Sequence, residues 1–227
     1  MDFEINSRGG WIIPDETVLG KVDVPRFSVV GGAATFDDET TFGDETTFGD
    51  ETTFGDWTKF GDWTTFGDWT TFGSYTTFGN WTTFGDETTF GDEIKFGDWT
   101  KFGDETTFGD NTTFGDGTKF GDETTFGNWT TFGDYTTFGN DTTLEGLKNA
   151  RIMCLSNITG SGRQIQIIVG LETGEMVIRA GCFRGSLEEF CNKAISENKK
   201  LYADVVSTAA KAFAAGVLAP TQPKGTP

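Results

Sequence analysis

The chain has 227 residues and a net charge of −18, with 35 Asp and Glu, 17 Lys and Arg, and no histidine. Such an acidic surface repels polyanions, which excludes direct binding of nucleic acid as the main activity. The lack of histidine removes the commonest general base near neutral pH. Without an apolar run of membrane-spanning length or a leader pattern at Met1 to Glu4, we expect a soluble cytoplasmic protein with no membrane partner.

Residues 1–35 hold an apolar segment, Trp11 to Pro14, and two apolar-glycine steps, Leu19-Gly20 and Val30-Gly31. The same step recurs regularly further along the chain. Because terminal copies in a repeat protein are atypical, we predict an N-terminal cap and degenerate copies of the repeat over 1–35. The Trp11 to Pro14 segment is predicted to close the first of them.

Residues 36–144 carry a strict repeat, with Phe at every sixth position from Phe36 to Phe138 and Leu144 in the next place. A period of six does not fit an α-helix, but it is a multiple of the two-residue period of a strand. We therefore predict that each Phe and the Thr two residues before it point inward. The residue directly before Phe and the variable residue three before it should point outward. The Gly-Asp or Gly-Asn that follows most of these Phe predicts a corner, with Gly at positive φ and Asp bonded to nearby backbone.

The unit Phe-Gly-Asp-x-Thr-Thr resembles the hexapeptide repeat of left-handed parallel β-helix proteins. The resemblance implies a mainly β fold in which three hexads form one triangular coil of 18 residues around a Phe-stacked core. At about 4.8 Å per strand layer, about six coils would give a rod about 30 Å long. The acyltransferases and carbonic anhydrases of this fold depend on histidine. Since this chain has none, neither activity carries over, and we expect no enzyme, no metal and no cofactor.

At a spacing of 18 residues, the variable positions form three columns with different compositions. The tryptophan column contains Glu45, Trp63, Trp81, Trp99, Gly117 and Tyr135. The mixed column contains Glu39, Trp57, Tyr75, Glu93, Asn111 and Trp129. The acidic column contains Glu51, Trp69, Glu87, Glu105, Glu123 and Asp141. One column of outward Thr, from Thr53 to Thr143, is free of lysine and belongs to the acidic side.

Residues 145–219 lose the period and predict a small α+β domain. Strands are expected over 151–158, 163–171 and 175–179, with turns at 160–162 and 172–174. Ser186 to Glu189 is a capping box, which predicts a helix to about 198, and a second helix is expected over 201–215 with Gly216 as its end. A disordered tail is predicted over 220–227.

Three cysteines, Cys154, Cys182 and Cys191, lie outside the repeats. Their odd number and lack of a pairing pattern indicate reduced thiols in a cytosolic protein. We predict that Cys182 and Cys191 pack in the core of the C-terminal domain.

Two surfaces are candidate interaction sites. The aromatic one consists of Trp63, Trp81, Trp99 and Tyr135, which can stabilise neighbouring coils, contact a protein or stack on a ligand or sugar. The acidic one consists of Glu51, Glu87, Glu105, Glu123 and Asp141. Calcium binding at the Gly-Asp corners is disfavoured, because one Asp per corner gives too few ligands. Ice binding by the outward Thr is disfavoured too, since their outward neighbours are Glu or Trp.

From Phe36 to Thr143 the repeats contain 23 acidic and 4 basic residues, a balance of −19. The leading hypothesis is an interaction protein, encoded by a phage or mobile element, whose acidic rod mimics nucleic acid. Its partner would be a basic DNA-handling or defence protein of the host. The first alternative is a structural rod that assembles as a homo-oligomer through the tryptophan column or the C-terminal domain. The second is a protein that sequesters a small nucleotide, either between rods or at the C-terminal domain.

Overall fold

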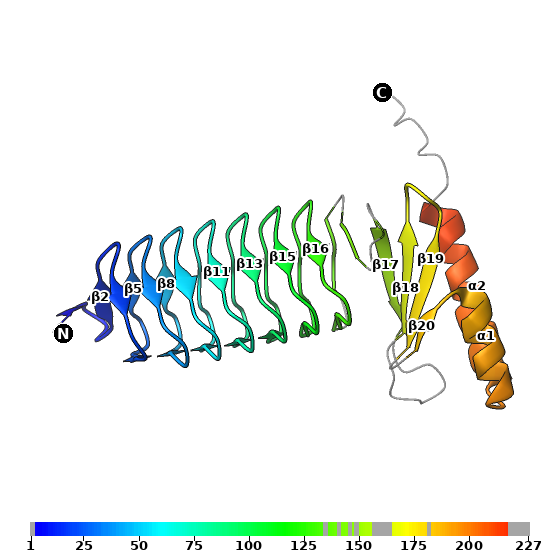
Figure 1. Ribbon diagram of the computed structural model, residues 1–227, viewed down its shortest axis with the longest axis horizontal. Coiled ribbons are helices and arrows are strands. Elements are labelled where there is room, and N and C mark those ends of the chain that lie inside the picture. The colour runs from blue at the N-terminus through cyan, green and yellow to red at the C-terminus, as the bar shows by residue number, and fades with distance from the viewer. Residues whose placement is uncertain are drawn as a thin grey trace, which may run out of the picture. The chain divides into compact units, whose positions relative to one another are not determined.

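The computed structural model describes residues 3–133, 136–139, 142–144, 147, 150–155, 165–180 and 183–217. The chain divides into two compact units, the solenoid (Met1–Glu145) and the C-terminal unit (Gly146–Pro227). In the solenoid, short strands from successive coils stack in rows along one axis (Figure 1).

Three rows of strands form the three faces of the solenoid. The first face contains β1 (Glu4–Ile5), β2 (Trp11–Ile13), β5 (Val29–Val30) and β8 (Thr47–Phe48). The second face contains β4 (Asp23–Val24), β7 (Thr41–Phe42), β10 (Lys59–Phe60), β12 (Thr77–Phe78) and β14 (Lys95–Phe96). The third face contains β3 (Val18–Leu19), β6 (Thr35–Phe36), β9 (Thr53–Phe54), β11 (Thr71–Phe72), β13 (Thr89–Phe90), β15 (Thr107–Phe108) and β16 (Thr125–Phe126). Single parallel bridges continue the first face from Thr47 through Thr65, Thr83, Lys101 and Lys119 to Thr137.

The register confirms the coil of three hexads. Lys59 pairs in parallel with Thr77, its equivalent three hexads later, and the same offset recurs along the second and third faces. Near the N-terminus, however, Val18 pairs with Thr35, an offset that is shorter by one position. The corner between β3 and β4 is therefore one residue short, which shows in what way this early coil is degenerate.

Stacked Phe rings fill the interior, as predicted. Phe60 stacks on Phe78 of the next coil at 4.9 Å with an interplanar angle of 3°, and it meets Phe66 of its own coil edge to face at 4.9 Å. Rings are thus parallel along the axis and perpendicular around it, both arrangements that the aromatic quadrupole favours. In the degenerate coils, smaller side chains are buried at the same positions: Ile13, Leu19, Val24 and Val30.

The two Thr of each hexad lie on opposite sides of the wall, as the two-residue period predicted. The first is buried, and its hydroxyl donates a hydrogen bond to the carbonyl oxygen three residues earlier, as from Thr64 to Gly61 at 2.9 Å. This satisfies a polar group that would otherwise be costly to bury. Ile94 fills the equivalent place in one coil and is fully buried. The second Thr is exposed along the strands.

At the corners, the prediction that glycine adopts positive φ is wrong. It is the variable residue, not the glycine, that adopts positive φ, for example 61° at Trp63 and 59° at Asn111. The corner glycine is needed for space, because a Cβ on Gly61 would lie 2.6 Å from the backbone nitrogen of Asp44. Asp44 does bond to backbone, but its Oδ1 accepts from the N–H of Asp62 in the next coil at 3.0 Å.

The N-terminal end also differs from the prediction for Trp11 to Pro14. Ile13 is the first buried inward residue, so β2 belongs to the first coil rather than covering it. The outer edge of β2 is covered by β1, which pairs with it antiparallel, Glu4 opposite Ile12. A covered edge offers no unpaired backbone to a neighbouring molecule.

The C-terminal unit has the predicted antiparallel strands and two helices. Its elements are β17 (Ala150–Leu155), β18 (Ile165–Gly170), β19 (Met176–Ala180), β20 (Phe183–Gly185), α1 (Leu187–Ser196) and α2 (Lys200–Val217). The strands follow each other in sheet order. The sequence reading missed the short β20, and it wrongly ended the second helix at Gly216, which lies inside α2. The predicted turn at 160–162 and tail at 220–227 lie outside the described residues.

One sheet face and both helices form the core of this unit. Its buried residues are Ile165, Ile167, Val169, Ile178, Phe190, Val206 and Ala210. Cys191 packs against this core as predicted, whereas Cys182 lies outside the described residues. The capping box is confirmed. The carboxylate of Glu189 accepts the backbone N–H of Ser186 at 2.8 Å, which lowers the pKa of Glu189.

Candidate interaction surfaces

The corners of the solenoid hold its exposed aromatic side chains in fixed directions. All six Trp of the repeats occupy variable positions and are 45 to 57% exposed. Positive φ is unfavourable for such residues. Here it is held by bonds between coils, as when the N–H of Trp63 donates to the carbonyl oxygen of Asn80 at 2.9 Å. The side chains are therefore presented on a rigid backbone.

The tryptophan column forms a continuous stack, as the spacing of its members predicted. Trp63 stacks on Trp81 at 5.1 Å, and Trp81 stacks on Trp99 at 5.4 Å. The ring of Trp99 covers Gly117, where a Cβ would lie 2.7 Å from the ring. Tyr135, the last predicted member, lies outside the described residues. Since its neighbours cover both faces of Trp81, this ring presents its edge to a partner, which disfavours stacking on a sugar.

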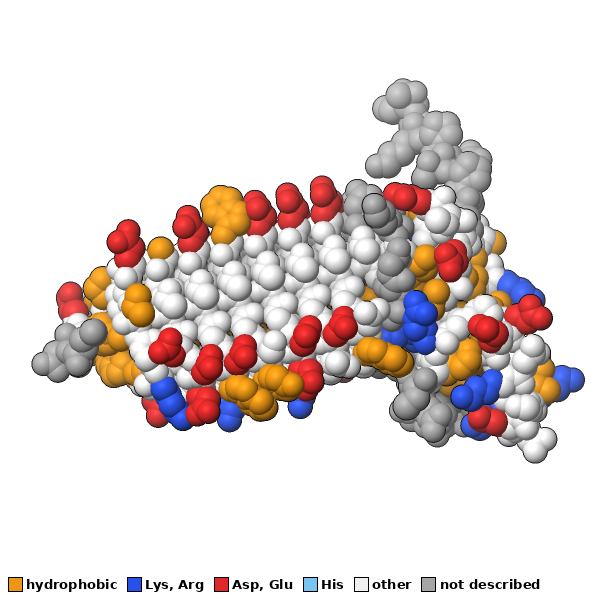
Figure 2. Space-filling model, viewed as in Figure 1, with side chains coloured by type: hydrophobic (Ala, Val, Ile, Leu, Met, Phe, Trp, Pro, Cys, Tyr) orange, Lys and Arg blue, Asp and Glu red, His pale blue; other side chains and the backbone are white. Residues whose placement is uncertain are grey.

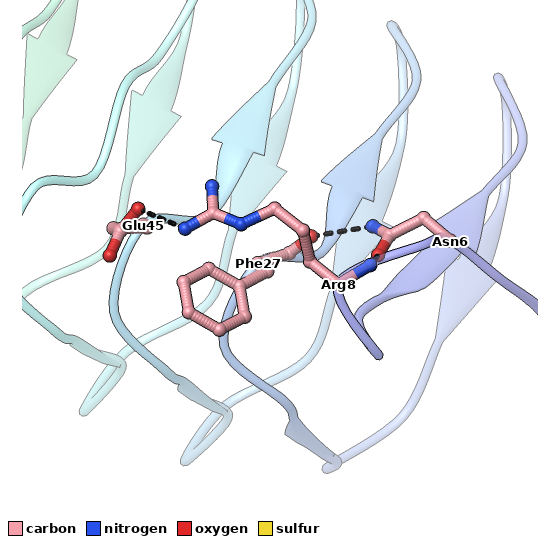
Figure 3. A network of polar contacts seen from close by, with 4 residues as sticks. All are labelled: Asn6, Arg8, Phe27 and Glu45. Carbon is pink, nitrogen blue, oxygen red and sulfur yellow. Dashed lines mark hydrogen bonds and ion pairs between the residues drawn. The ribbon is translucent and has the colours of Figure 1, made fainter.

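A basic cluster at the N-terminal end of the tryptophan column was missed by the sequence reading. The guanidinium of Arg8 lies 3.8 Å from the ring centroid of Phe27 and donates to the Glu45 carboxylate at 2.6 Å (Figure 3). Arg26 lies 4.2 Å from the same ring, and Asn6 donates to the carbonyl of Phe27 at 2.7 Å. The sequence does contain an indication of this cluster, because Phe27 lies one full coil before Glu45 in the same column. These contacts neutralise charge at this end of the column.

The acidic column brings the predicted glutamates into one row. Glu51, Glu87, Glu105 and Glu123 are all exposed, with Trp69 between the first two. A second acidic row lies beside it on the same corner: Asp50, Asp68, Asp86, Asp104 and Asp122. Figure 2 shows acidic side chains lined up along edges of the solenoid. Asp141 lies outside the described residues.

Hydrogen bonds between coils position the inner Asp row. Oδ1 of Asp50 accepts the backbone N–H of Asp68 at 3.0 Å, and Oδ1 of Asp68 accepts that of Asp86 at 2.8 Å. The ladder continues through Asp104 to Asp122. One oxygen of each bonded carboxylate is thus fixed by the backbone, whereas the glutamates of the outer row project freely.

The four lysines of the repeats lie on two of the three faces. Lys59 and Lys95 are on the second face, and Lys101 and Lys119 are neighbours on the first. Within the described part of the chain none of the four forms an ion pair, because the acids sit at the corners and the lysines on the strands. The outward residues of the third face, from Thr53 to Thr125, are all Thr.

The mixed column contains a second aromatic stack that the sequence reading did not single out. Trp57 and Tyr75 lie 4.3 Å apart with an interplanar angle of 3°. Their separation by one full coil in the sequence was the available signal. The pKa of the Tyr75 hydroxyl is raised, chiefly by hydrogen bonding to the neighbouring Glu93 carboxylate.

These surfaces present fixed carboxylates, aromatic edges and isolated ammonium groups. Among the described residues, no group of three or more His, Cys, Asp or Glu side chains could hold a metal ion. Neither described helix combines the length and the hydropathy needed to cross a bilayer. Fold and surface together define a parallel β-solenoid of regular Thr/Phe hexads, in keeping with the hexapeptide-repeat resemblance. Comparison with protein-family models, curated proteins and solved structures found no match to the chain.

Proposed function

We propose that the solenoid is a non-enzymatic interaction module that competes with DNA for the basic cleft of a DNA-handling protein. The observation that carries the proposal is charge density. The repeats hold a balance of −19 over residues 36–143. Six coils at about 4.8 Å each give about one net charge per 1.5 Å of axis. Double-stranded DNA carries one charge per roughly 1.7 Å. To a basic cleft, the two polyanions are therefore similar in linear charge.

The acidic column is the proposed contact surface. Its inner Asp row is bonded to backbone, so those charges are already in place before a partner arrives. Preorganised groups lose less entropy on binding than mobile ones. The outer row of Glu87, Glu105 and Glu123 can then adapt to the partner's Lys and Arg. Of the two faces that meet at this corner, the third carries no lysine from Thr53 to Thr125, and the first carries Lys101 and Lys119.

The experiment is a capture assay in which bound proteins are displaced with duplex DNA. The purified chain is immobilised and exposed to a lysate of its host at low salt. Proteins held by the acidic column should be displaced by DNA and by about 0.5 M salt, because both weaken an exposed charge contact. A purified candidate from this fraction is then tested for competition between the chain and labelled duplex DNA.

Two double variants with equal charge locate the contact. Glu87→Asn with Glu105→Asn alters the acidic column, and Glu39→Asn with Glu93→Asn makes the same change of charge in the mixed column. Asparagine is suitable because Asn111 already occupies a variable position at φ 59°. The first variant should lose about tenfold or more in affinity for the candidate, and the second should change little. Equal losses of affinity in the two double variants would mean that the candidate responds only to the overall charge of the chain. A captured protein that DNA does not displace would refute the proposed mimicry.

The half-exposed stack of Trp63, Trp81 and Trp99 supports a second candidate, a rod that self-assembles through this column. Aromatic side chains are enriched in the cores of protein interfaces. Sedimentation of the free chain tests it. A salt-resistant oligomer that becomes monomeric in Trp81→Asn would favour assembly, whereas a monomer at all concentrations would exclude it.

A further inference from the structure

Two adjoining grooves lie along the second face of the solenoid, on the side of the mixed column. The larger, of about 530 Å³, is lined by Trp57, Lys59, Tyr75, Thr77, Glu93, Lys95 and Asn111. The smaller, of about 340 Å³, is lined by Lys21, Asp23, Glu39, Thr41, Trp57 and Lys59. Trp57 and Lys59 therefore line both. The larger groove is of a size that small-molecule sites commonly have.

The floor of the larger groove can bind an anion. Lys59, Thr77 and Lys95 are in-register neighbours on β10, β12 and β14. The two lysines are thus about 10 Å apart at their Cα atoms, with a hydroxyl between them. Their flexible four-carbon stems allow both ammonium groups to reach one anion above Thr77. In the described part of the chain neither lysine is paired with a carboxylate, so neither has to be released first.

The wall of the grooves can bind a planar ring. Tyr75 covers one face of Trp57 at 4.3 Å and lies one coil towards the C-terminus. The smaller groove joins Trp57 to residues of the coil on its N-terminal side, the side that Tyr75 does not cover. Within this groove, Lys21 is paired with Glu39 and lowers the pKa of that carboxyl. An open indole face next to a free ammonium group suits a flat ligand that also carries negative charge.

We propose that these grooves form one binding site for a nucleoside monophosphate. The base stacks on the open face of Trp57, and the phosphate lies between Lys59 and Lys95 above Thr77. Glu93 is the carboxylate that opposes the phosphate in this groove, and its proximity to the Tyr75 hydroxyl raises the pKa of that hydroxyl. The site does not depend on the proposed competition with DNA, because it uses the mixed column and the second face rather than the acidic column.

The test is a titration with three probes: AMP, adenosine and inorganic phosphate. Indole N–H signals in two-dimensional NMR spectra report each Trp, and the signal absent in Trp57→Asn identifies Trp57. AMP should shift the Trp57 signal more than those of Trp63, Trp81 and Trp99. It should also bind more tightly than adenosine or phosphate, because each of these lacks one of the two contacts.

Single variants separate the two halves of the site, and each introduces a residue that the same column carries in another coil. Lys59→Thr should weaken AMP binding by roughly five- to tenfold, through the loss of a charge-assisted bond. Trp57→Asn, with the residue that Asn111 supplies in the same column, should weaken AMP by about fivefold or more through lost stacking, but it adds no charge and should leave phosphate binding within about twofold. Glu93→Asn should tighten AMP by about twofold, because it removes the opposing charge. Lys119→Thr, the matched control on the first face, should have no effect.

Several results would overturn the site. Equal losses in Lys59→Thr and Lys119→Thr would mean that AMP responds only to overall charge. If adenosine bound as tightly as AMP, the lysines would have no part in binding. A Trp57 signal unmoved by millimolar AMP would exclude the stacking contact. Because AMP occupies a different face, it should not release a protein captured by the acidic column, so this proposal and the proposed function can fail independently.

Discussion

The solenoid and the C-terminal unit build their cores by different rules. In the solenoid one residue type recurs at one position, and each Phe contacts rings of its own coil and of the coils on either side. In the C-terminal unit, aliphatic residues of one sheet face pack against two amphipathic helices, joining segments far apart in sequence. A repeat protein is stabilised by sums of neighbour contacts, whereas a small mixed domain unfolds as a single unit.

This difference can be measured because the two units have separate optical signals. All seven Trp lie in the solenoid, at Trp11 and at the variable positions. Both helices of the described chain, α1 and α2, lie in the C-terminal unit. Tryptophan fluorescence therefore follows unfolding of the solenoid, and circular dichroism in the helical band of the far ultraviolet follows mainly the C-terminal unit.

The largest effect is expected from Phe84→Ala. Phe84 stacks on Phe66 and Phe102 at 4.9 Å each, and it meets Phe78 and Phe90 edge to face at 5.0 Å. Removing the ring leaves a cavity between two coils and should cost about 4 kcal/mol of unfolding free energy. Denaturant unfolding should show the fluorescence transition shifted and the dichroism transition little changed.

Ile167→Ala is the reciprocal variant, since Ile167 is fully buried in the core of the C-terminal unit. It should cost about 3 kcal/mol and shift the dichroism transition instead. If either variant shifted the fluorescence and dichroism transitions equally, the two units would unfold together. The proposed difference between their cores would then be contradicted.

The next prediction contrasts two glycines. A Cβ on the corner residue Gly73 would lie 2.6 Å from the backbone nitrogen of Asp56, whereas one on Gly216 would meet no atom within 4 Å. Gly73→Ala should therefore cost about 3 kcal/mol, since the coils cannot separate locally. Gly216→Ala, near the end of α2, should stabilise by up to about 0.5 kcal/mol. Thermal unfolding measures whether each variant is destabilised or stabilised. A cost below about 1 kcal/mol for Gly73→Ala would show that the corner can accommodate a Cβ.

The same glycines show which features of the fold could be predicted from the sequence and which could not. A strict period of six predicted the coil, the inward Phe and Thr, and the members of each corner column. These follow from the two-residue alternation of side chains along a strand and from the repeat spacing alone. The residue that takes positive φ was assigned wrongly. A Gly-Asp pair normally indicates a glycine turn, but here the close approach of the preceding coil excludes a Cβ at glycine, and no local pattern shows that neighbour. At Gly216, the helical context outweighed the local preference of glycine to end a helix.

The candidate surfaces were predictable where one column could be read by itself. The stack of Trp63, Trp81 and Trp99 and the row of glutamates follow directly from the spacing of one coil. The groove at Lys59 and Lys95 does not, because it combines a strand position on one face with a variable position at the adjoining corner. How far a side chain reaches across that corner depends on the left-handed backbone at Trp57 and Tyr75, at φ 61° and 59°.

The smallest effect tests the carboxylate ladder that links coil to coil. Oδ1 of Asp62 accepts the backbone N–H of Asn80 at 2.7 Å, and Oδ1 of Asn80 accepts that of Asp98 at 2.8 Å. An amide oxygen thus serves as well as a carboxylate oxygen. Asp62→Asn should leave the fluorescence transition within about 0.3 kcal/mol, whereas Asp62→Ala should cost about 1 kcal/mol, because it removes the acceptor.

The C-terminal unit offers the matched contrast, since Glu189 accepts the backbone N–H of Ser186 within a single capping box. Glu189→Ala should destabilise only α1 and its unit, by roughly 0.5 to 1 kcal/mol, and should leave the fluorescence transition unchanged. Equal stability of Asp62→Ala and Asp62→Asn would mean that the ladder adds nothing to the stacked Phe. The corner acids of the solenoid would then be retained for their charge alone.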